Sequence, residues 1–154
     1  MRFGVNMKPF NFLIDRDVSK VATLFPAKRT STIEDAGLPE NASDSRIVEV
    51  AWELDAIIVT GNGDDFIKRM KEFSRQTKRK DCRDLRGLVI LPSKFEIQKR
   101  VLNNLESRLR FNGKPIRWKD VQRLNLCVSA KAVGKNPEIH QFPKCFYCQK
   151  LDDD

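Results

Sequence analysis

The stretch from residue 43 to residue 66 constrains the fold of this chain more than any other. Apolar side chains recur between residues 47 and 54 at i, i+3, i+4 and i+7, which is one face of a helix. The run Ala-Ile-Ile-Val at residues 56–59 is apolar throughout and rich in β-branched residues, as in a strand covered on both faces of a parallel sheet. A helix followed by such a strand predicts an α/β fold.

Acidic and small residues surround this helix and strand. Ser43 is placed to cap the helix, and Asp44 lies in its first turn, where negative charge is favoured. The strand is followed directly by Thr-Gly-Asn-Gly-Asp-Asp-Phe at residues 60–66. In open parallel α/β sheets, ligands bind beyond the carboxyl ends of the strands. Adjacent carboxylates at that place predict a positively charged ligand.

The rest of the chain alternates in the same way. We expect strands at residues 10–14, 27–33, 88–91 and 124–128, and helices at residues 18–25, 66–76 and 94–110. Residues 138–142 are expected to form a short hairpin partner for the last main strand. This alternation predicts a three-layer α/β/α domain with a mostly parallel central sheet over residues 1–142. Residues 143–154 are expected to form a cysteine-containing, partly flexible tail.

The charge and the histidine content of the chain limit the kinds of function that it can have. The net charge of +8 favours a polyanionic partner. Because His140 is the single histidine, a nuclease that uses a histidine pair as acid and base is excluded. Hydrolysis of a nucleic acid by this chain would need carboxylates and a metal ion.

The cellular location of the protein is predicted from the absence of long apolar segments in its sequence. No apolar run approaches the roughly 18 residues of a membrane helix, and the N-terminal residues lack the apolar core of a signal peptide. We therefore expect a cytoplasmic protein without a membrane partner. The four cysteines are then expected to be reduced.

Five aspartates fall at ends of strands or starts of helices, and together they predict a metal site. They are Asp15 and Asp17 after the first strand, Asp44 at a helix start, and Asp64 and Asp65 after the third strand. Carboxylate oxygens in this number suit Mg²⁺ or Mn²⁺. Such an ion can generate hydroxide near neutral pH and stabilise the charge that grows on a phosphodiester.

Three segments carry a resemblance to a known family. They are FLIDRDVS at residues 12–19, ASDSRIVEVAWELDAIIVTGNGDDF at residues 42–66 and GLVILPS at residues 87–93. In their order and spacing they resemble the PIN-like nuclease domains, and most of all the small single-domain branch related to the VapC ribonuclease toxins. The resemblance implies a metal-dependent endoribonuclease with RNA as substrate and an antitoxin protein as a partner.

The resemblance also implies roles for single residues. Asp15 matches the acid after the first strand, Asp44 the acid that opens the central helix, and Asp65 the acid before the phenylalanine, so these three are the implied catalytic residues. Asn62 stands where the family has another acid, and the loop is one residue longer. Asp64, Asp17 and Asn62 are therefore expected to complete the metal site.

Basic residues follow the last of these acids. Seven lie between residues 68 and 80, interrupted by only one acid, Glu72. A solvated helix face is one interpretation, and contact with a phosphate backbone is the one we favour. The residues are Lys68, Arg69, Lys71, Arg75, Lys78, Arg79 and Lys80.

Several alternatives stay open from sequence. Asp44 could serve only the helix dipole, Asp17 could be a helix cap, and the acids at 64 and 65 could be ordinary turn residues. The domain could be catalytically inactive and bind RNA or a protein, and a second copy of the chain is a further candidate partner. His140, Cys145 and Cys148 could contribute to a zinc site, which would need a fourth ligand.

Overall fold

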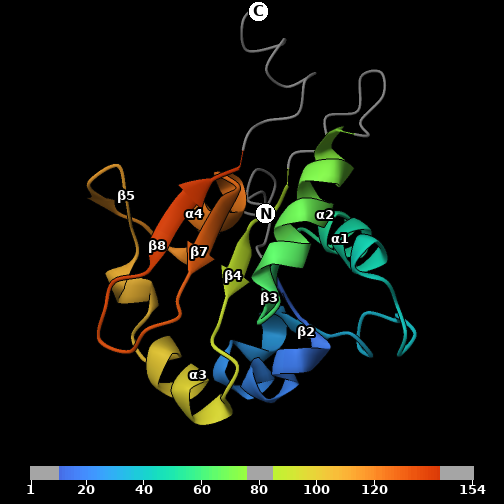
Figure 1. Cartoon of the computed structure of the whole chain (residues 1–154), viewed down its shortest axis with the longest axis horizontal. Coiled ribbons are helices and arrows are strands. Elements are labelled where there is room, and N and C mark those ends of the chain that lie inside the picture. The colour runs from blue at the N-terminus through green and yellow to red at the C-terminus, as the bar shows by residue number, and fades with distance from the viewer. Residues whose placement is uncertain (1–10, 76–84, 143–154) are drawn as a thin grey trace, which may run out of the picture.

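A six-stranded sheet forms the centre of the fold (Figure 1). The computed structural model describes residues 11–75 and 85–142. The strands lie in the order β2-β1-β3-β4-β7-β8, and all neighbours are parallel except β8, which is antiparallel to β7. Their bounds are β1 Asn11–Ile14, β2 Thr30–Thr32, β3 Ala56–Thr60, β4 Leu88–Ile90, β7 Leu126–Ser129 and β8 Glu138–Gln141.

Helices cover both faces of this sheet. On one face lie α1 (Asp44–Glu53) and α2 (Gly63–Arg75). The other face carries the 3-10 helix η1 (Arg16–Leu24), α3 (Phe95–Leu102) and α4 (Trp118–Arg123). The predicted α/β class and the mostly parallel sheet are thus confirmed. Shorter elements are η2 (Ala27–Arg29), η3 (Glu106–Arg108) and the hairpin of β5 (Arg110–Phe111) with β6 (Lys114–Pro115).

The side-chain pattern of the central strands explains the two layers. Every residue of β3 is buried, with Ile57 and Val59 in the core beneath α3 and α4, and Ile58 in the core beneath α1 and α2. Phe66 and Met70, one turn apart on α2, lie in the same core as Ile58. Fully burying each such side chain contributes about 1.5–3 kcal/mol. A strand apolar on both faces therefore cannot lie at a solvent-exposed edge.

The predicted helix over residues 94–110 is wrong in its second half. α3 ends at Leu102, and Asn104 adopts a left-handed conformation with φ of 58°. Asparagine accepts that conformation more readily than most residues, so the apolar spacing beyond it no longer specifies a helix. The chain instead forms η3 and the β5–β6 hairpin, whose turn uses Asn112 and Gly113 at positive φ. Helix α4 was also not predicted.

Two successive crossovers have opposite hands. The chain passes from β3 to β4 through α2 on one face, and from β4 to β7 through α3 and α4 on the other face. Both steps advance in the same direction across the sheet (Figure 1). One of them therefore departs from the right-handed rule for parallel strands. Of the helices in residues 11–75 and 85–142, none combines the length and apolar character needed to cross a bilayer.

The start of α2 depends on a glycine, which gives a test of the fold. A Cβ at Gly63 would lie 2.5 Å from Cδ1 and 2.9 Å from Cγ1 of buried Ile90 on β4. We expect Gly63→Ala to lower the free energy of unfolding by about 1–3 kcal/mol, the usual range for overpacking. Urea denaturation measures this change. In an Ile90→Ala background the cost should shrink by at least about 1 kcal/mol, and strictly additive effects would contradict this packing.

Candidate active site

The parallel pairing of β1 with β3 places Asp15 at the carboxyl ends of the central strands, which we call the carboxyl edge of the sheet. Ile14 pairs with Val59, and the backbone N–H of Asp15 donates to the carbonyl of Val59 at 2.9 Å. Asp15 therefore lies beside Thr60, the last residue of β3. Figure 1 shows that η1, α3 and the start of α2 lie at this same edge. It is the carboxyl edge of the parallel strands, where the sequence predicted a site.

A chain of hydrogen bonds fixes the Asp15 carboxylate. Thr60 is fully buried, and its hydroxyl donates to Oδ2 of Asp15 at 2.8 Å while accepting from the backbone N–H of Asn62 at 2.9 Å. Oδ1 of Asp15 accepts from the N–H of Arg16 at 2.8 Å and thereby caps η1. Both oxygens of Asp15 are thus oriented by its neighbours.

Asp17 lies against the same strand end. Its Oδ2 accepts from the backbone N–H of Gly61 at 3.2 Å, across 44 residues of chain. A Cβ on Gly61 would lie 2.9 Å from that oxygen, so the approach needs a glycine. Partial burial, followed by the charge of Asp15 and a hydrogen bond with it, raises the pKa of Asp17 to about 6. The alternative that Asp17 serves as the helix cap is wrong, because Asp15 caps η1 and Asp17 lies in its first turn.

Asp44 approaches the edge from α1. Ser43 caps this helix as predicted, because its hydroxyl accepts from the N–H of Arg46 at 3.2 Å. Partial burial raises the pKa of Asp44, and the charges of Asp15 and Asp65 raise it further, whereas Arg69 opposes them. Two carboxylates from distant parts of the sequence are therefore close enough to Asp44 to disfavour its ionised form.

Asp65 and Asp64 occupy the first turn of α2, but only one of them contacts another site residue. The side-chain N–H of Asn62 donates to Oδ2 of Asp65 at 2.9 Å. Asp64 is exposed, and no hydrogen bond or ion pair to it is formed among the described residues. Asp15 is thus close to Asp17 and Asp44, and Asp65 is close to Asp44, whereas Asp64 lies apart from the other four aspartates.

The donor atoms at this edge suit a hard divalent cation in chemistry and charge. Asp15 and Asp17 supply carboxylate oxygens side by side. The pKa values of Asp17 and Asp44 are raised by burial and then by neighbouring negative charge, and a bound cation would favour the ionised form of both groups. Within residues 11–75 and 85–142, however, no three His, Cys, Asp or Glu side chains lie close enough together to hold an ion. A cation held by three of these acids would therefore require side-chain movement.

The predicted basic residues are distributed along α2 rather than gathered at its start. Arg69 lies near Asp44 and pairs with Glu72 at 3.0 Å. Lys71 instead lies near Cys127 on β7, and Arg75 is about 15 Å along the helix axis from Asp65. Lys68 shares the first half of the helix with Arg69. Lys78, Arg79 and Lys80 lie outside the described residues.

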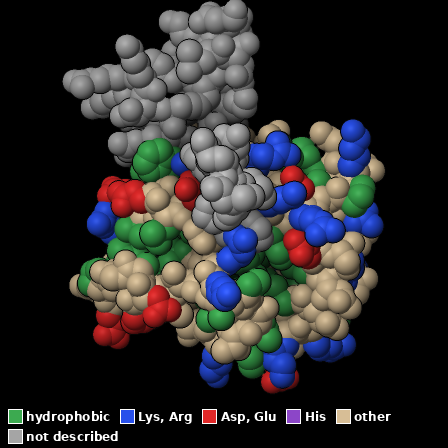
Figure 2. Space-filling model, turned by 180° about the vertical axis from the view of Figure 1, so that it is seen from behind, with side chains coloured by type: hydrophobic (Ala, Val, Ile, Leu, Met, Phe, Trp, Pro, Cys, Tyr) green, Lys and Arg blue, Asp and Glu red, His purple; other side chains and the backbone are tan. Residues whose placement is uncertain are grey.

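Positive charge is not confined to α2. Figure 2 shows the face opposite to α2, where Lys and Arg side chains are scattered among acidic ones. Basic side chains of the described residues therefore lie on this face as well as on α2. A polyanion approaching the acidic edge would meet basic side chains on both faces of the sheet.

The proposed zinc ligands are only partly described. His140 is exposed on β8 and pairs with Cys127 across the antiparallel ladder, but Cys127 is buried and its pKa is raised to about 11 by that burial. A thiol so hard to ionise is a poor metal ligand. Cys145 and Cys148 lie outside the described residues, as does the whole predicted tail over residues 143–154.

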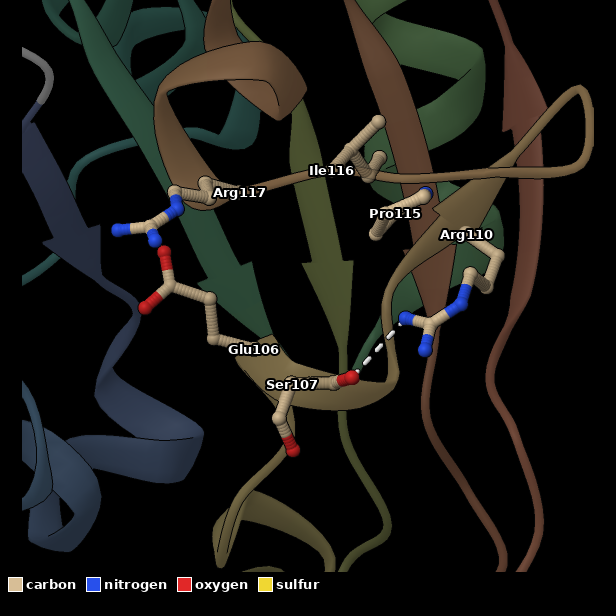
Figure 3. A pocket seen from close by; sticks show the side chains of 6 residues that line it. All are labelled: Glu106, Ser107, Arg110, Pro115, Ile116 and Arg117. Atoms are coloured by element: carbon tan, nitrogen blue, oxygen red, sulfur yellow. Dashed lines mark hydrogen bonds between the residues drawn. The ribbon is translucent and has the colours of Figure 1, made fainter.

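Of two cavities in the described part of the chain, only one is lined by a predicted site residue. A cavity of about 440 Å³ is formed by η3 and the β5–β6 hairpin (Figure 3). There Arg110 donates to the carbonyl of Ser107 at 2.9 Å, and Glu106 accepts from the N–H of Trp118 at 2.9 Å. These groups serve the local backbone. The other cavity, of about 290 Å³, lies between η1 and α3 and is lined in part by Asp17.

The chain was compared with protein-family models, with curated proteins and with solved structures, and none of them matches. The resemblance to PIN-like nucleases stays a prediction from the sequence. Two features of the site were missed by sequence reasoning: the contact of Asp17 with Gly61, and the hydroxyl of Thr60 on Asp15. The glycine after a buried strand is the signal that could have indicated a close approach there.

The raised pKa of Asp17 predicts a dependence of stability on pH. Between the usual pKa of aspartate and about 6, the folded state holds a proton that the unfolded state has lost. The contribution of Asp17 to stability is therefore fully present below the usual pKa and is lost as the pH rises through about 6. Urea denaturation at pH 4.5 and pH 7.5 measures this loss.

The matched variants are Asp17→Asn and Asp64→Asn. Asparagine can still accept from Gly61, and it carries no charge next to Asp15. We expect Asp17→Asn to gain stability over wild type at pH 7.5 and to gain little at pH 4.5. Asp64→Asn controls for the loss of an exposed acid. An equal effect of Asp17→Asn at both pH values would contradict the coupling with Asp15.

Proposed function

We propose that this protein is a metal-dependent ribonuclease of the PIN-like type, with Mg²⁺ or Mn²⁺ as its cofactor. The observation that supports it best is the convergence of four aspartates at the carboxyl ends of the strands, where Asp15 bears on Asp17 and both Asp15 and Asp65 bear on Asp44. Carboxylates that raise one another's pKa are unfavourable for stability unless a cation is bound. Their position beyond the carboxyl ends of parallel strands is also where α/β proteins bind ligands.

Charge supports an RNA substrate. The chain carries a net charge of +8, and basic side chains lie on α2 beside the acidic edge as well as on the opposite face. Lys68 and Arg69 are the candidates for holding phosphates nearest to the acids, and Lys71 and Arg75 would contact the strand further along the helix. Affinity that depends on such contacts falls as the salt concentration rises.

The metal would be held by Asp15 and Asp17, with Asp44 and Asp65 as the further carboxylates. When bound, it would supply a nucleophilic hydroxide and stabilise the negative charge that develops on the phosphodiester. Thr60 orients Asp15 through its hydroxyl, and the N–H of Gly61 holds Asp17 at the strand end. With a pKa of about 6, Asp17 is largely ionised near neutral pH and can act as a carboxylate ligand there.

A second candidate function is an inactive module that binds RNA or a protein partner. It is favoured by the hydrogen bond from the Asn62 side chain to Asp65, which satisfies one of the acids without a cation. In the ribonuclease proposal, an antitoxin protein as partner follows from the resemblance alone, and a cytoplasmic setting and a second copy of the chain as partner stay expectations from the sequence.

Replacement of Asp15 tests the ribonuclease proposal. Asp15→Asn removes the charge but keeps a carbonyl that can accept from Thr60, so the fold should persist. We expect Mn²⁺-dependent cleavage of single-stranded RNA to fall to the level of a protein-free control. Asp35→Asn, whose acid lies in the turn after β2, should cleave like wild type.

Binding of Mn²⁺ to the two variants separates the two candidate functions. Wild type and Asp35→Asn should melt at a higher temperature with Mn²⁺, because the ion binds the folded state. Asp15→Asn should show little of this rise. Equal cleavage by Asp15→Asn and wild type would reject the assignment, whereas RNA binding by wild type without turnover in either metal would favour the inactive module.

A further inference from the structure

The cavity of about 290 Å³ between η1 and α3 lies next to the acidic edge. It is lined by Asp17 and Lys20 from η1, Ser93 from the segment after β4, and Phe95 and Gln98 from α3, among others. Asp17 belongs to both places, because its carboxylate also accepts from the N–H of Gly61. A ligand in this cavity would therefore reach the proposed metal site.

Gln98 gives this cavity a specific polar group. The residue is 2% exposed, and its Nε2 donates to the carbonyl of Pro92 at 2.7 Å. This bond fixes the orientation of the amide, since the reverse orientation would place Oε1 against the oxygen of Pro92. Among the described residues, nothing donates a hydrogen bond to Oε1. A buried amide is thus held with its donor side satisfied and its acceptor side unused.

An unused acceptor selects the chemistry of its ligand. Oε1 can only accept, so the ligand must bring an N–H or O–H group. The phosphodiester group of an RNA strand offers only acceptor oxygens, so it cannot donate to Oε1, although Arg16 and Lys20 in the same cavity would attract its charge and Asp17 would oppose it. The nucleoside part of a nucleotide carries such donors, on the ribose hydroxyl groups and on the nitrogen atoms of the bases.

The cavity wall argues for edge contacts rather than stacking. The Phe95 ring is covered by two ammonium groups, Lys20 at 5.9 Å and Lys99 at 5.4 Å from its centre. A base would have to displace a lysine in order to stack on the ring face those groups cover. Ser93 adds a hydroxyl that can donate or accept at the rim. At about 290 Å³, the space is suited to a single residue of a chain.

We propose that this cavity binds the nucleoside of one ribonucleotide next to the scissile phosphate, and that Oε1 of Gln98 accepts a hydrogen bond from its ribose hydroxyl or base N–H. The inference rests on the proposed ribonuclease function for the identity of the chain that is bound. Gln98 acts here as a substrate-positioning residue, not as a group that touches the reacting atoms.

Nuclear magnetic resonance on metal-free wild-type protein tests this binding without any cleavage. The probes are the four ribonucleoside 5′-monophosphates, their 2′-deoxy counterparts and inorganic phosphate. We expect ribonucleotides to shift the side-chain amide signal of Gln98 and phosphate alone to leave it in place. Loss of the shift with deoxynucleotides assigns the donor to the ribose, and dependence on the base assigns it to a base N–H.

A matched pair of variants gives the energetic test. Gln98→Met keeps the size of the side chain and removes its acceptor, and we expect it to bind ribonucleotides about fivefold to tenfold more weakly, the loss of about one hydrogen bond. Gln141→Met is the control, because this exposed glutamine on β8 also donates to a carbonyl, that of Leu124. It should bind like wild type.

The outcomes separate this inference from the proposed function. If Gln98 does not respond to any nucleotide, responds equally to phosphate, or can be replaced by Met without loss of binding, the inference is overturned, even when wild type cleaves RNA. If Gln98 responds as expected but wild type cleaves no RNA with Mg²⁺ or Mn²⁺, the nucleoside site stands and the ribonuclease proposal fails.

Discussion

The parallel pairing of β1 with β3 is the interaction on which the rest of the site depends. It is an apolar pairing inside the core, between Phe12–Ile14 and Ile57–Val59. The driving force is burial of these side chains on both faces of the sheet, yet its consequence is electrostatic. The register that buries Ile14 beside Val59 also places Asp15 beside Thr60 and allows Asp17 to reach Gly61.

The site therefore has a cost that the core must offset. Burial, and after it the charges of neighbouring acids, raises the pKa of Asp17 and of Asp44, and the fold tolerates the four carboxylates because hydrogen bonds from Thr60, Gly61 and Asn62 hold three of them in place. Such an arrangement is typical of sites where stability is reduced in favour of ligand binding. Among the described residues, no three acidic side chains lie close enough together to hold an ion. This spacing is consistent with acidic side chains that move when a cation binds.

Much of the fold followed from the sequence because two periodicities are unambiguous in it. The continuous apolar run at residues 56–59 and the helical spacing at residues 47–54 each specify one structure, and both were confirmed. The prediction of a helix over residues 103–110 was wrong, because the apolar residues there keep a helical spacing while Asn104 breaks the helix by its backbone conformation. Spacing reports which side chains can share a face, and it carries no information on a single φ angle.

The same limit applied to the site. Acids that follow buried strands could be expected at one edge, since the carboxyl ends of parallel strands meet there. Three contacts could not be predicted in this way: Asp17 with Gly61, Thr60 with Asp15, and Gln98 with Pro92. The first two join residues far apart in the chain, and the third depends on a bend of the backbone. Lys71 was predicted to join the basic residues near the acids, because it belongs to the same basic run. In the structure it lies near Cys127 on β7.

The central claim is that the aspartates at the carboxyl edge affect one another's ionisation and that a divalent cation binds there and favours their ionised forms. It is tested most directly by titrating the side-chain carboxyl carbon of Asp17 by nuclear magnetic resonance, with and without Mg²⁺. The account predicts titration near pH 6 without the ion and a clearly lower pKa with it. Titration of Asp17 in the ordinary range of an aspartate, unchanged by Mg²⁺, would contradict the account.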